Sequence, residues 1–424
     1  MKRISFKQSP FAQNVFILLT GSLISQVLPF LMLPILQKFF YKPADFGILA
    51  VFISMCEIFS SIACLKMEFA IVVQRTIRNA INTAFSAIKI TGLMTLFSLL
   101  IVVLFRNQLS EYYNEPKLAD YLFLLPIYVF LVGTNDVLSY WFNRKKKFKV
   151  ISSSKVVQTS FAETIKLVFG YLGSNYVGLL FGRLLGFLFS GYYLIRRFFK
   201  EDARSLKLIT HRESNQMVKE NKKYLFFTTP GVFVNSLINL IYLNLFISYY
   251  GKDIAGLLGV SMAYLSAGFG VIAISFSQVF FSKVSEIEDS HHLLQVYKRF
   301  AKQLALMALI PLGIIYLIPT KLVVYLLGEE WNQLLSVARI MAVWLSVWFV
   351  SSSLSFIYIR LGRQKEMLLF DCVHLLLIVI GFFTARMIDV SLNSALWGFS
   401  ISQSIYYLFA VFIAIYFIKK TKQV

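Results

Sequence analysis

Five charged residues lie inside long apolar runs of this chain, where charge is costly. Glu57, Glu163, Lys166 and Arg183 lie within such runs, and Arg339 lies in the outer part of another. In hydrocarbon a charged side chain costs about 2.5–3.5 kcal/mol by insertion scales and usually faces a wet cavity or a partner. A carboxyl group placed there can carry a proton or a cation, and a cation can bind an anionic group. These residues therefore indicate a site that handles charge.

The spacing of these residues leaves some charges paired and others without a local partner. Glu163 and Lys166 are three residues apart, so on a helix they share a face. They either neutralise each other or both face a cavity. Arg183 and Arg339 have no carboxylate within one helical turn. We predict that an anionic group passing through the cavity compensates them, the alternative being a partner on another helix.

A polar stripe is predicted around Glu57. Glu57, Ser61, Cys64 and Glu68 follow the spacing i, i+4, i+7, i+11, which places them on one helix face. Desolvation disfavours the charged form of a carboxyl group at this depth. Glu57 is therefore a candidate carrier of H⁺ or Na⁺, with Glu163 as the second candidate.

Other polar side chains extend the candidate site. Lys66 and Lys89 lie nearer the ends of apolar runs, where long side chains can also reach the interface. Asn235 and Asn239 form a stripe on one run, and Gln278 belongs to a stripe on the next. The predicted substrate-facing set is Arg183, Arg339, Lys166, Lys66, Lys89, Asn235, Asn239 and Gln278.

Twelve apolar runs of about 20 residues must position these side chains. A run of that length crosses about 30 Å of hydrocarbon as a helix. The 424 residues are 58% hydrophobic and only 15% charged, with a mean hydropathy of +0.69, which excludes a soluble enzyme with a single anchor. We expect an all-α polytopic membrane protein. The predicted spans are 12–34, 46–66, 82–105, 121–142, 154–173, 176–196, 224–250, 255–281, 301–320, 333–357, 367–386 and 392–418.

The net charge of +21 comes from basic residues whose distribution indicates how the chain is oriented in the membrane. One set of alternate connections and tails holds 29 Lys and Arg residues, and the other set holds 7. Basic residues accumulate on the cytoplasmic side of short loops. The split predicts a multi-pass inner-membrane protein with both termini in the cytoplasm. Because membrane topology accounts for the excess of basic residues, we do not expect nucleic-acid binding.

Related segments about half a chain apart predict two similar halves. FFYK at 39–42 corresponds to YYGK at 249–252, and NRKK at 143–146 corresponds to GRQK at 362–365. Six spans lie in each half, so both halves have the same orientation in the membrane. We predict two pseudo-symmetric six-helix lobes around a central cavity.

The predicted boundary between the lobes divides the longest connection. The N-terminal lobe covers 1–210 and the C-terminal lobe 211–424, with the cytoplasmic linker 197–223 shared between them. That linker is too short for a core of its own.

Motifs for cofactor chemistry are absent from the sequence. It contains no phosphate loop, no HExxH and no D-x-D, and its four histidines lack metal-ligand spacing. We therefore expect no enzymatic activity, no metal and no cofactor apart from possible coupling to H⁺ or Na⁺.

The segment LPILQKFFYKPADFG at 33–47 resembles the junction after the first span of bacterial polysaccharide-biosynthesis flippases. These are Wzx-type O-antigen transporters of the multidrug/oligosaccharidyl-lipid/polysaccharide (MOP) exporter superfamily. YWFNRK at 140–145, SQVF at 277–280 and LGEEW at 327–331 are similar to that family as well. The resemblance implies twelve helices, a V-shaped cavity and alternating access.

Three functions follow as hypotheses. The first is a flippase that moves undecaprenyl-pyrophosphate-linked oligosaccharide, as a repeat unit of O-antigen, capsule or exopolysaccharide, across the inner membrane. Its partners would be this lipid-linked oligosaccharide, membrane lipid, a polysaccharide polymerase and glycosyltransferases. The second is a multidrug exporter of the same fold driven by Na⁺ or H⁺. The third, a membrane polysaccharide polymerase or ligase, is disfavoured because the outer connections are short.

Overall fold

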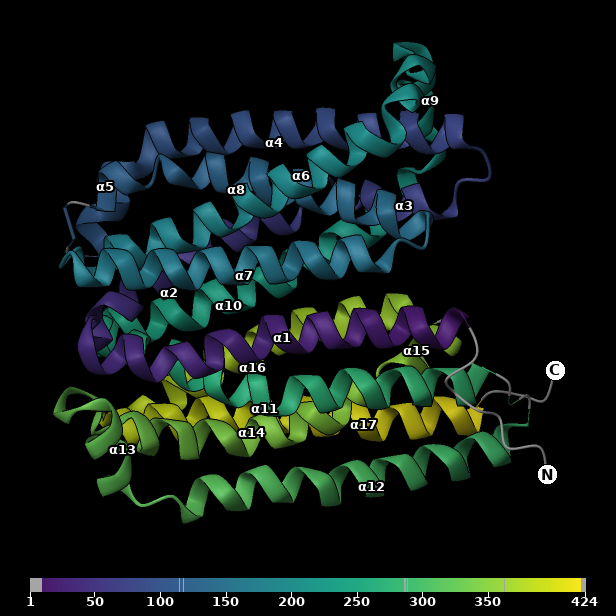
Figure 1. The fold of residues 1–424 in the computed structure, drawn as a ribbon. Helices are drawn as coiled ribbons and strands as arrows, with labels where there is room; N and C mark the ends of the chain where they lie inside the picture. The colour runs from purple at the N-terminus through teal and green to yellow at the C-terminus, as the bar shows by residue number, and fades with distance from the viewer. Residues whose placement is uncertain are drawn as a thin grey trace. The chain divides into compact units, whose positions relative to one another are not determined.

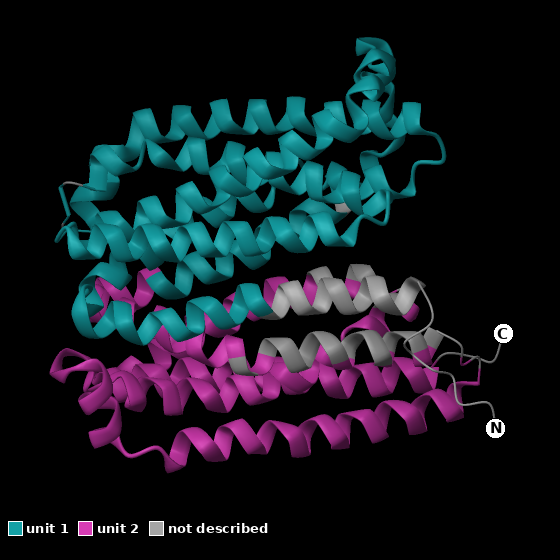
Figure 2. Cartoon of the chain, viewed as in Figure 1, with its two compact units in different colours: residues 1–243 teal, residues 244–424 magenta. Residues whose placement is uncertain are grey.

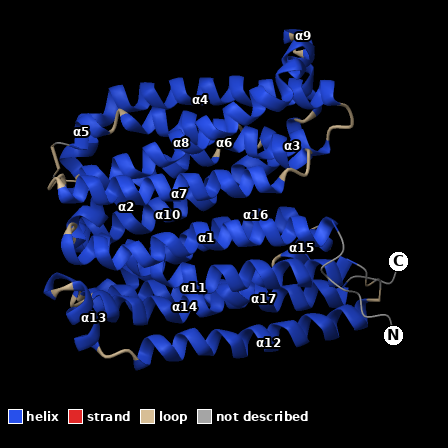
Figure 3. Cartoon of the chain, viewed as in Figure 1, coloured by secondary structure: helices blue, strands red, loops and turns tan. Residues whose placement is uncertain are grey.

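Twelve long helices dominate the computed structural model, which describes residues 10–113, 115–116, 118–285, 287, 289–361 and 363–420 (Figure 1). The described residues form helices and connections without a strand (Figure 3). Each predicted span coincides with one long helix. These helices are α1 (Pro10–Phe39), α2 (Pro43–Ser61), α4 (Ile77–Tyr112), α6 (Leu124–Arg144), α7 (Phe148–Tyr171), α8 (Asn175–Asp202), α10 (Thr229–Tyr250), α11 (Lys252–Ser285), α12 (Ser290–Leu317), α14 (Leu334–Leu354), α16 (Gln364–Ile388) and α17 (Leu392–Lys420).

Shorter helical segments connect the long helices. The α-helical ones are α3 (Met67–Val73), α5 (Leu118–Tyr121), α9 (His211–Glu220), α13 (Thr320–Leu327) and α15 (Phe356–Arg360). The others are the 3₁₀ helices η1 (Ala203–Leu208) and η3 (Glu329–Trp331) and the π-helix η2 (Tyr224–Thr228).

Most of the long helices are apolar enough to cross a bilayer. Among the described residues, nine candidate spans are both long and apolar enough. The remaining long helices α1, α7 and α11 have 30, 24 and 34 residues, which exceeds the length that a bilayer requires. Charged residues, Glu163 and Lys166 among them, make α7 less apolar than the rest. The prediction of an all-α polytopic membrane protein is confirmed.

The chain divides into two units, residues 1–243 and 244–424 (Figure 2). Within the first unit α7 packs against α1 and α8, while α6 packs against α2, α4 and α8. Within the second unit α14 packs against α11, α12 and α17, and α16 packs against α17. The boundary falls inside α10, so the linker that precedes α10 belongs to the first unit.

Small residues bring α7 and α8 close together. A Cβ atom added at Gly186 would lie 2.7 Å from the Gln158 carbonyl oxygen and 2.9 Å from the Ala162 Cβ. One added at Gly178 would lie 2.3 Å from the Tyr41 hydroxyl. Only a residue without a side chain fits such a contact, which is the packing that small residues every four positions favour in membranes.

The linker between α8 and α10 is fixed in place by buried polar side chains of α4. Asn82 is completely buried and donates to the Leu208 carbonyl oxygen at 3.0 Å and to Glu213 Oε2 at 2.9 Å. The Asn82 Oδ1 accepts from the Thr210 amide at 2.9 Å, and Arg78 pairs with Glu213 at 2.6 Å. These contacts hold α9 at the N-terminal end of α4 (Figure 1).

Candidate functional site

The candidate site lies in the first unit, where α2, α6 and α8 carry Glu57, Tyr128 and Arg183. Both α6 and α8 pack against α2, and they also pack against each other. The start of α2 is fixed locally, because Pro43 occupies its first turn and the Lys42 amide donates to Asp45 Oδ2 at 2.9 Å. That anchor sets the rotation of the helix that presents Glu57.

The Arg183 guanidinium has partners from two other helices. It interacts electrostatically with the Tyr128 hydroxyl of α6 and with Glu57 of α2. It also lies over the Phe187 ring, with Cζ 5.6 Å from the centroid. Its Nε is buried and has no hydrogen-bond partner among the described residues. The carboxylate that interacts with Arg183 is therefore Glu57 on another helix, although the two form no ion pair among the described residues.

Glu57 also interacts with α10. Tyr242 is buried and lies within electrostatic range of Glu57. One turn further along α2, Ser61 accepts a hydrogen bond from the Ser236 hydroxyl at 2.9 Å. The Glu57 carboxyl group is thus surrounded by one cation and one phenol from different helices.

The stripe predicted from Glu57 to Glu68 does not continue as one helix face. Helix α2 ends at Ser61, and Leu65 and Lys66 adopt left-handed backbone conformations with φ of 46° and 57°. Cys64 instead contacts Thr91 Oγ1 at 3.3 Å on α4. The prediction failed because periodicity alone does not reveal a turn without Gly or Pro.

Glu163 and Lys166 form the ion pair that their spacing allows. Lys166 Nζ lies 2.6 Å from Glu163 Oε1, and Glu163 is 4% exposed. The Tyr41 hydroxyl donates to the Lys166 carbonyl oxygen at 2.6 Å, and Gly182 leaves room for the Lys166 stem. Since the two charges neutralise each other, Glu57 is the stronger candidate for ion coupling.

A second charged cluster gathers around Lys66. Its Nζ lies 3.5 Å from Glu68 Oε1, and Glu68 is 3% exposed with Oε2 unpartnered among the described residues. Asp136 on α6 interacts electrostatically with Lys66, Glu68 and Lys155. Sequence reasoning missed this cluster and the role of Tyr128, because no sequence spacing relates residues on α2, α3, α6 and α7.

Other predicted site residues lie apart from Arg183. Lys89 donates to Asn215 Oδ1 at 3.0 Å and so helps to hold α9. Asn235 and Asn239 are exposed on α10, where Asn235 Nδ2 donates to the Gly231 carbonyl oxygen at 3.2 Å. The side chain of Gln278, on α11, lies outside the described residues.

Arg339 has a different environment from the one predicted. Its guanidinium donates to the carbonyl oxygens of Tyr316 at 3.2 Å and Ile318 at 2.8 Å, at the C-terminal end of α12. The last carbonyl groups of a helix carry partial negative charge, so they compensate a cation. Of the two alternatives left open for Arg339, the structure shows the partner on another helix, since this residue caps α12.

Comparison with known proteins places the chain in a family. The family model described as "Polysaccharide biosynthesis protein" matches residues 35–336, which include Glu57, Tyr128 and Arg183. The chain belongs to the polysaccharide biosynthesis protein family. Among curated proteins, no sequence matches the chain.

Solved structures similar to this family member are MOP superfamily transporters and a flippase. A multidrug resistance MATE family transporter in an inward-facing conformation has a TM-score of 0.73 at 14% identity, with 96% of each chain covered. The lipid II flippase MurJ, in an inward closed conformation, has a TM-score of 0.74 at 14% identity, with 94% of this chain and 87% of that chain covered. A MOP superfamily transporter from Pyrococcus furiosus has a TM-score of 0.62 at 14% identity, with 99% of each chain covered. The polysaccharide biosynthesis protein therefore has the MOP transporter fold.

Proposed function

We propose that this polysaccharide biosynthesis protein is a flippase for lipid-linked oligosaccharide, working by alternating access. The observation that carries the proposal is the Arg183 guanidinium, which lies inside a membrane-spanning unit, interacts electrostatically with Glu57 and Tyr128, and has a buried Nε without a hydrogen-bond partner among the described residues. The family and the MurJ-like fold support it. An oligosaccharide headgroup cannot enter hydrocarbon with its hydroxyl groups unpaired, so a polar path must carry it while the lipid tail stays in the bilayer.

Arg183 binds the anionic linkage of the substrate in this mechanism. A pyrophosphate group and the Glu57 carboxylate compete for the same guanidinium, because one arginine fork cannot serve two anions equally. Protonation of Glu57 removes the competitor and frees Arg183 for the substrate. Loss of that proton restores the Glu57 interaction and favours release. Na⁺ at Glu57 would act in the same way.

Direction and location follow from the charge split. The 29 to 7 distribution of basic residues supports both termini in the cytoplasm of a bacterial inner membrane. Substrate then enters from the cytoplasmic leaflet, where glycosyltransferases assemble it, and leaves to the outer leaflet, where a polymerase consumes it.

A coupled multidrug exporter is the second candidate, and the likeness to a MATE family transporter favours it. In that function Glu57 would bind H⁺ or Na⁺ and the substrate would be a soluble molecule. No comparable observation supports the function of a polysaccharide polymerase or ligase.

Transport in reconstituted vesicles tests the proposal. Wild-type protein is expected to move a fluorescent undecaprenyl-pyrophosphate-linked oligosaccharide between leaflets, whereas Arg183→Met loses this activity. Lys200→Ala is the matched control, since Lys200 is an exposed cation on the same helix. Accumulation of a cationic drug without movement of the lipid substrate would favour the exporter instead.

A further inference from the structure

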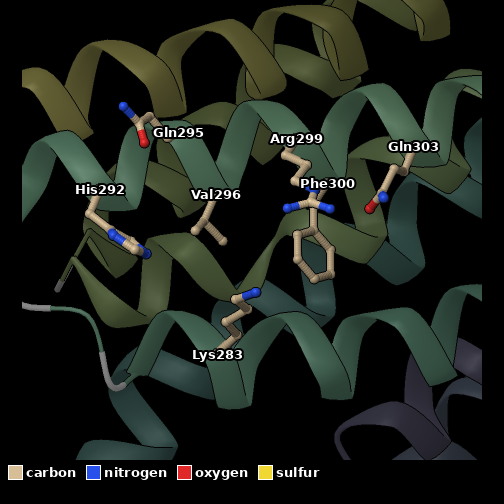
Figure 4. A pocket seen from close by; sticks show the side chains of 7 residues that line it. All are labelled: Lys283, His292, Gln295, Val296, Arg299, Phe300 and Gln303. Carbon is tan, nitrogen blue, oxygen red and sulfur yellow. The ribbon is translucent and has the colours of Figure 1, made fainter.

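A groove in the second unit lies between the last turn of α11 and the first half of α12 (Figure 4). Its volume is about 410 Å³. We call it the α11–α12 groove. It is lined by Lys283, His292, Gln295, Val296, Arg299, Phe300 and Gln303.

The lining of the α11–α12 groove is basic. Lys283 points from α11 toward α12, and Arg299 points into the same space (Figure 4). His292 and the two glutamines are further hydrogen-bonding groups, and none of the described lining residues is acidic. Within the described residues, neither Lys283 nor Arg299 pairs with an acidic side chain. In the part of the chain that the structure describes, two cations therefore face one concave surface without a paired carboxylate.

The described acidic residue nearest to the groove in the sequence, Asp289, is engaged elsewhere. The Asp289 carboxylate caps α12 by accepting from the backbone amides of His291 and His292 at 3.2 and 2.7 Å. Arg360 donates to the Val284 and Ile287 carbonyl oxygens at 3.3 and 3.1 Å, so a different cation occupies the end of α11. Lys283 and Arg299 stay available for a ligand.

The polar face of α12 continues into an exposed apolar face. Arg299, Gln303, Leu306 and Ile310 follow i, i+4, i+7, i+11 and share one side of the helix. Leu306 is 57% exposed and Ile310 is 64% exposed. Because the predicted span begins at about residue 301, the groove lies at the level of the lipid headgroups and the apolar face lies alongside their chains.

We propose that the α11–α12 groove binds the phosphate group of an anionic phospholipid in the cytoplasmic leaflet, with an acyl chain along Leu306 and Ile310. Lys283 and Arg299 pair with the phosphodiester, while His292 and Gln303 offer further donors. A bilayer phospholipid fits because the groove opens beside a lipid-facing surface. The proposal does not depend on the flippase function, since a drug exporter would carry the same groove.

The test measures binding of phosphatidylglycerol to purified full-length protein by native mass spectrometry. A basic side chain at an anionic lipid surface contributes roughly a fivefold gain in affinity. Lys283→Ala and Arg299→Ala should each weaken phosphatidylglycerol binding about fivefold, and the double variant about 30-fold. Arg299→Lys should retain most of the affinity.

Lys298→Ala is the matched control, because Lys298 is an exposed cation on α12 that does not line the groove. Its affinity for phosphatidylglycerol should equal that of the wild type, and melting temperatures should confirm that all variants are folded. Equal loss in Lys298→Ala and Arg299→Ala would overturn the proposal, as would equal binding of phosphatidylcholine. Displacement of phosphatidylglycerol by a lower concentration of undecaprenyl pyrophosphate would overturn phospholipid as the occupant.

Discussion

Replacing Arg183 with methionine tests whether Glu57 and Arg183 act as a pair. Methionine keeps much of the volume but removes the charge, so the Glu57 carboxyl group stays among α2, α6 and α8 without its cation. Glu57 and Arg183 interact electrostatically without forming an ion pair, and such an interaction contributes at most about 1 kcal/mol. Because Arg183 also loses its place beside Tyr128 and over Phe187, we expect about 1–2 kcal/mol for Arg183→Met.

The second single variant removes the other charge. Glu57→Gln leaves Arg183 beside Tyr128 and over Phe187, so it should cost only about 0.5–1 kcal/mol. The double variant removes both charges. It should therefore be about 0.5 kcal/mol more stable than the sum of the single variants predicts, at the lower end of the range for coupled residues.

Equilibrium unfolding in detergent micelles measures these free energies. The control is a second cycle between Glu57→Gln and Lys200→Ala, because Lys200 is exposed on the same helix as Arg183. That cycle should be additive. Additivity in the Glu57 and Arg183 cycle as well would refute the pairing, and with it the competition between Glu57 and substrate for Arg183.

Three further predictions concern the framework. Arg339→Ala should lower the melting temperature, because three carbonyl oxygens near the end of α12 lose their donor. Transport per folded molecule should stay near the wild-type value. A selective loss of transport would instead show that Arg339 contacts the substrate. Gly186→Ala should destabilise the protein by about 1–3 kcal/mol, because the added Cβ would lie 2.7 Å from the Gln158 carbonyl oxygen. Gly92→Ala has open space and serves as its control in the same unfolding measurement, and equal effects would contradict the packing argument. Arg78 lowers the pKa of Glu213 below its ordinary value of 4.5, so this interaction stabilises α9 at pH above that value and is lost as the pH falls through the lowered pKa. Hydrogen exchange of α9 amides at neutral pH should therefore be faster in Glu213→Gln than in the wild type, whereas unchanged exchange would show that the contacts of Asn82 and Lys89 are sufficient to hold α9.

The helical architecture was accessible from the sequence because each span depends on local apolarity. Every predicted span coincides with one long helix. The pairing of Glu163 with Lys166 was one of two open alternatives, since a spacing of three residues allows contact but does not require it.

The partners of isolated charges were not accessible from the sequence. Arg183 and Arg339 look alike in a sequence, as cations without a nearby carboxylate. In the structure Arg183 meets Glu57 and Tyr128, whereas Arg339 meets carbonyl oxygens of α12. Tertiary packing between helices decides which group compensates each cation, and single-helix periodicity contains no information on that packing.

Movement of the lipid-linked oligosaccharide itself tests the central claim most directly. Purified protein in vesicles is supplied with fluorescent undecaprenyl-pyrophosphate-linked oligosaccharide, and a membrane-impermeant quencher reports the leaflet that holds it. The flippase account predicts protein-dependent movement that Arg183→Met abolishes, Arg183→Lys partly restores and Lys200→Ala leaves unchanged. Wild-type rates in Arg183→Met, at equal amounts of folded protein, would contradict it.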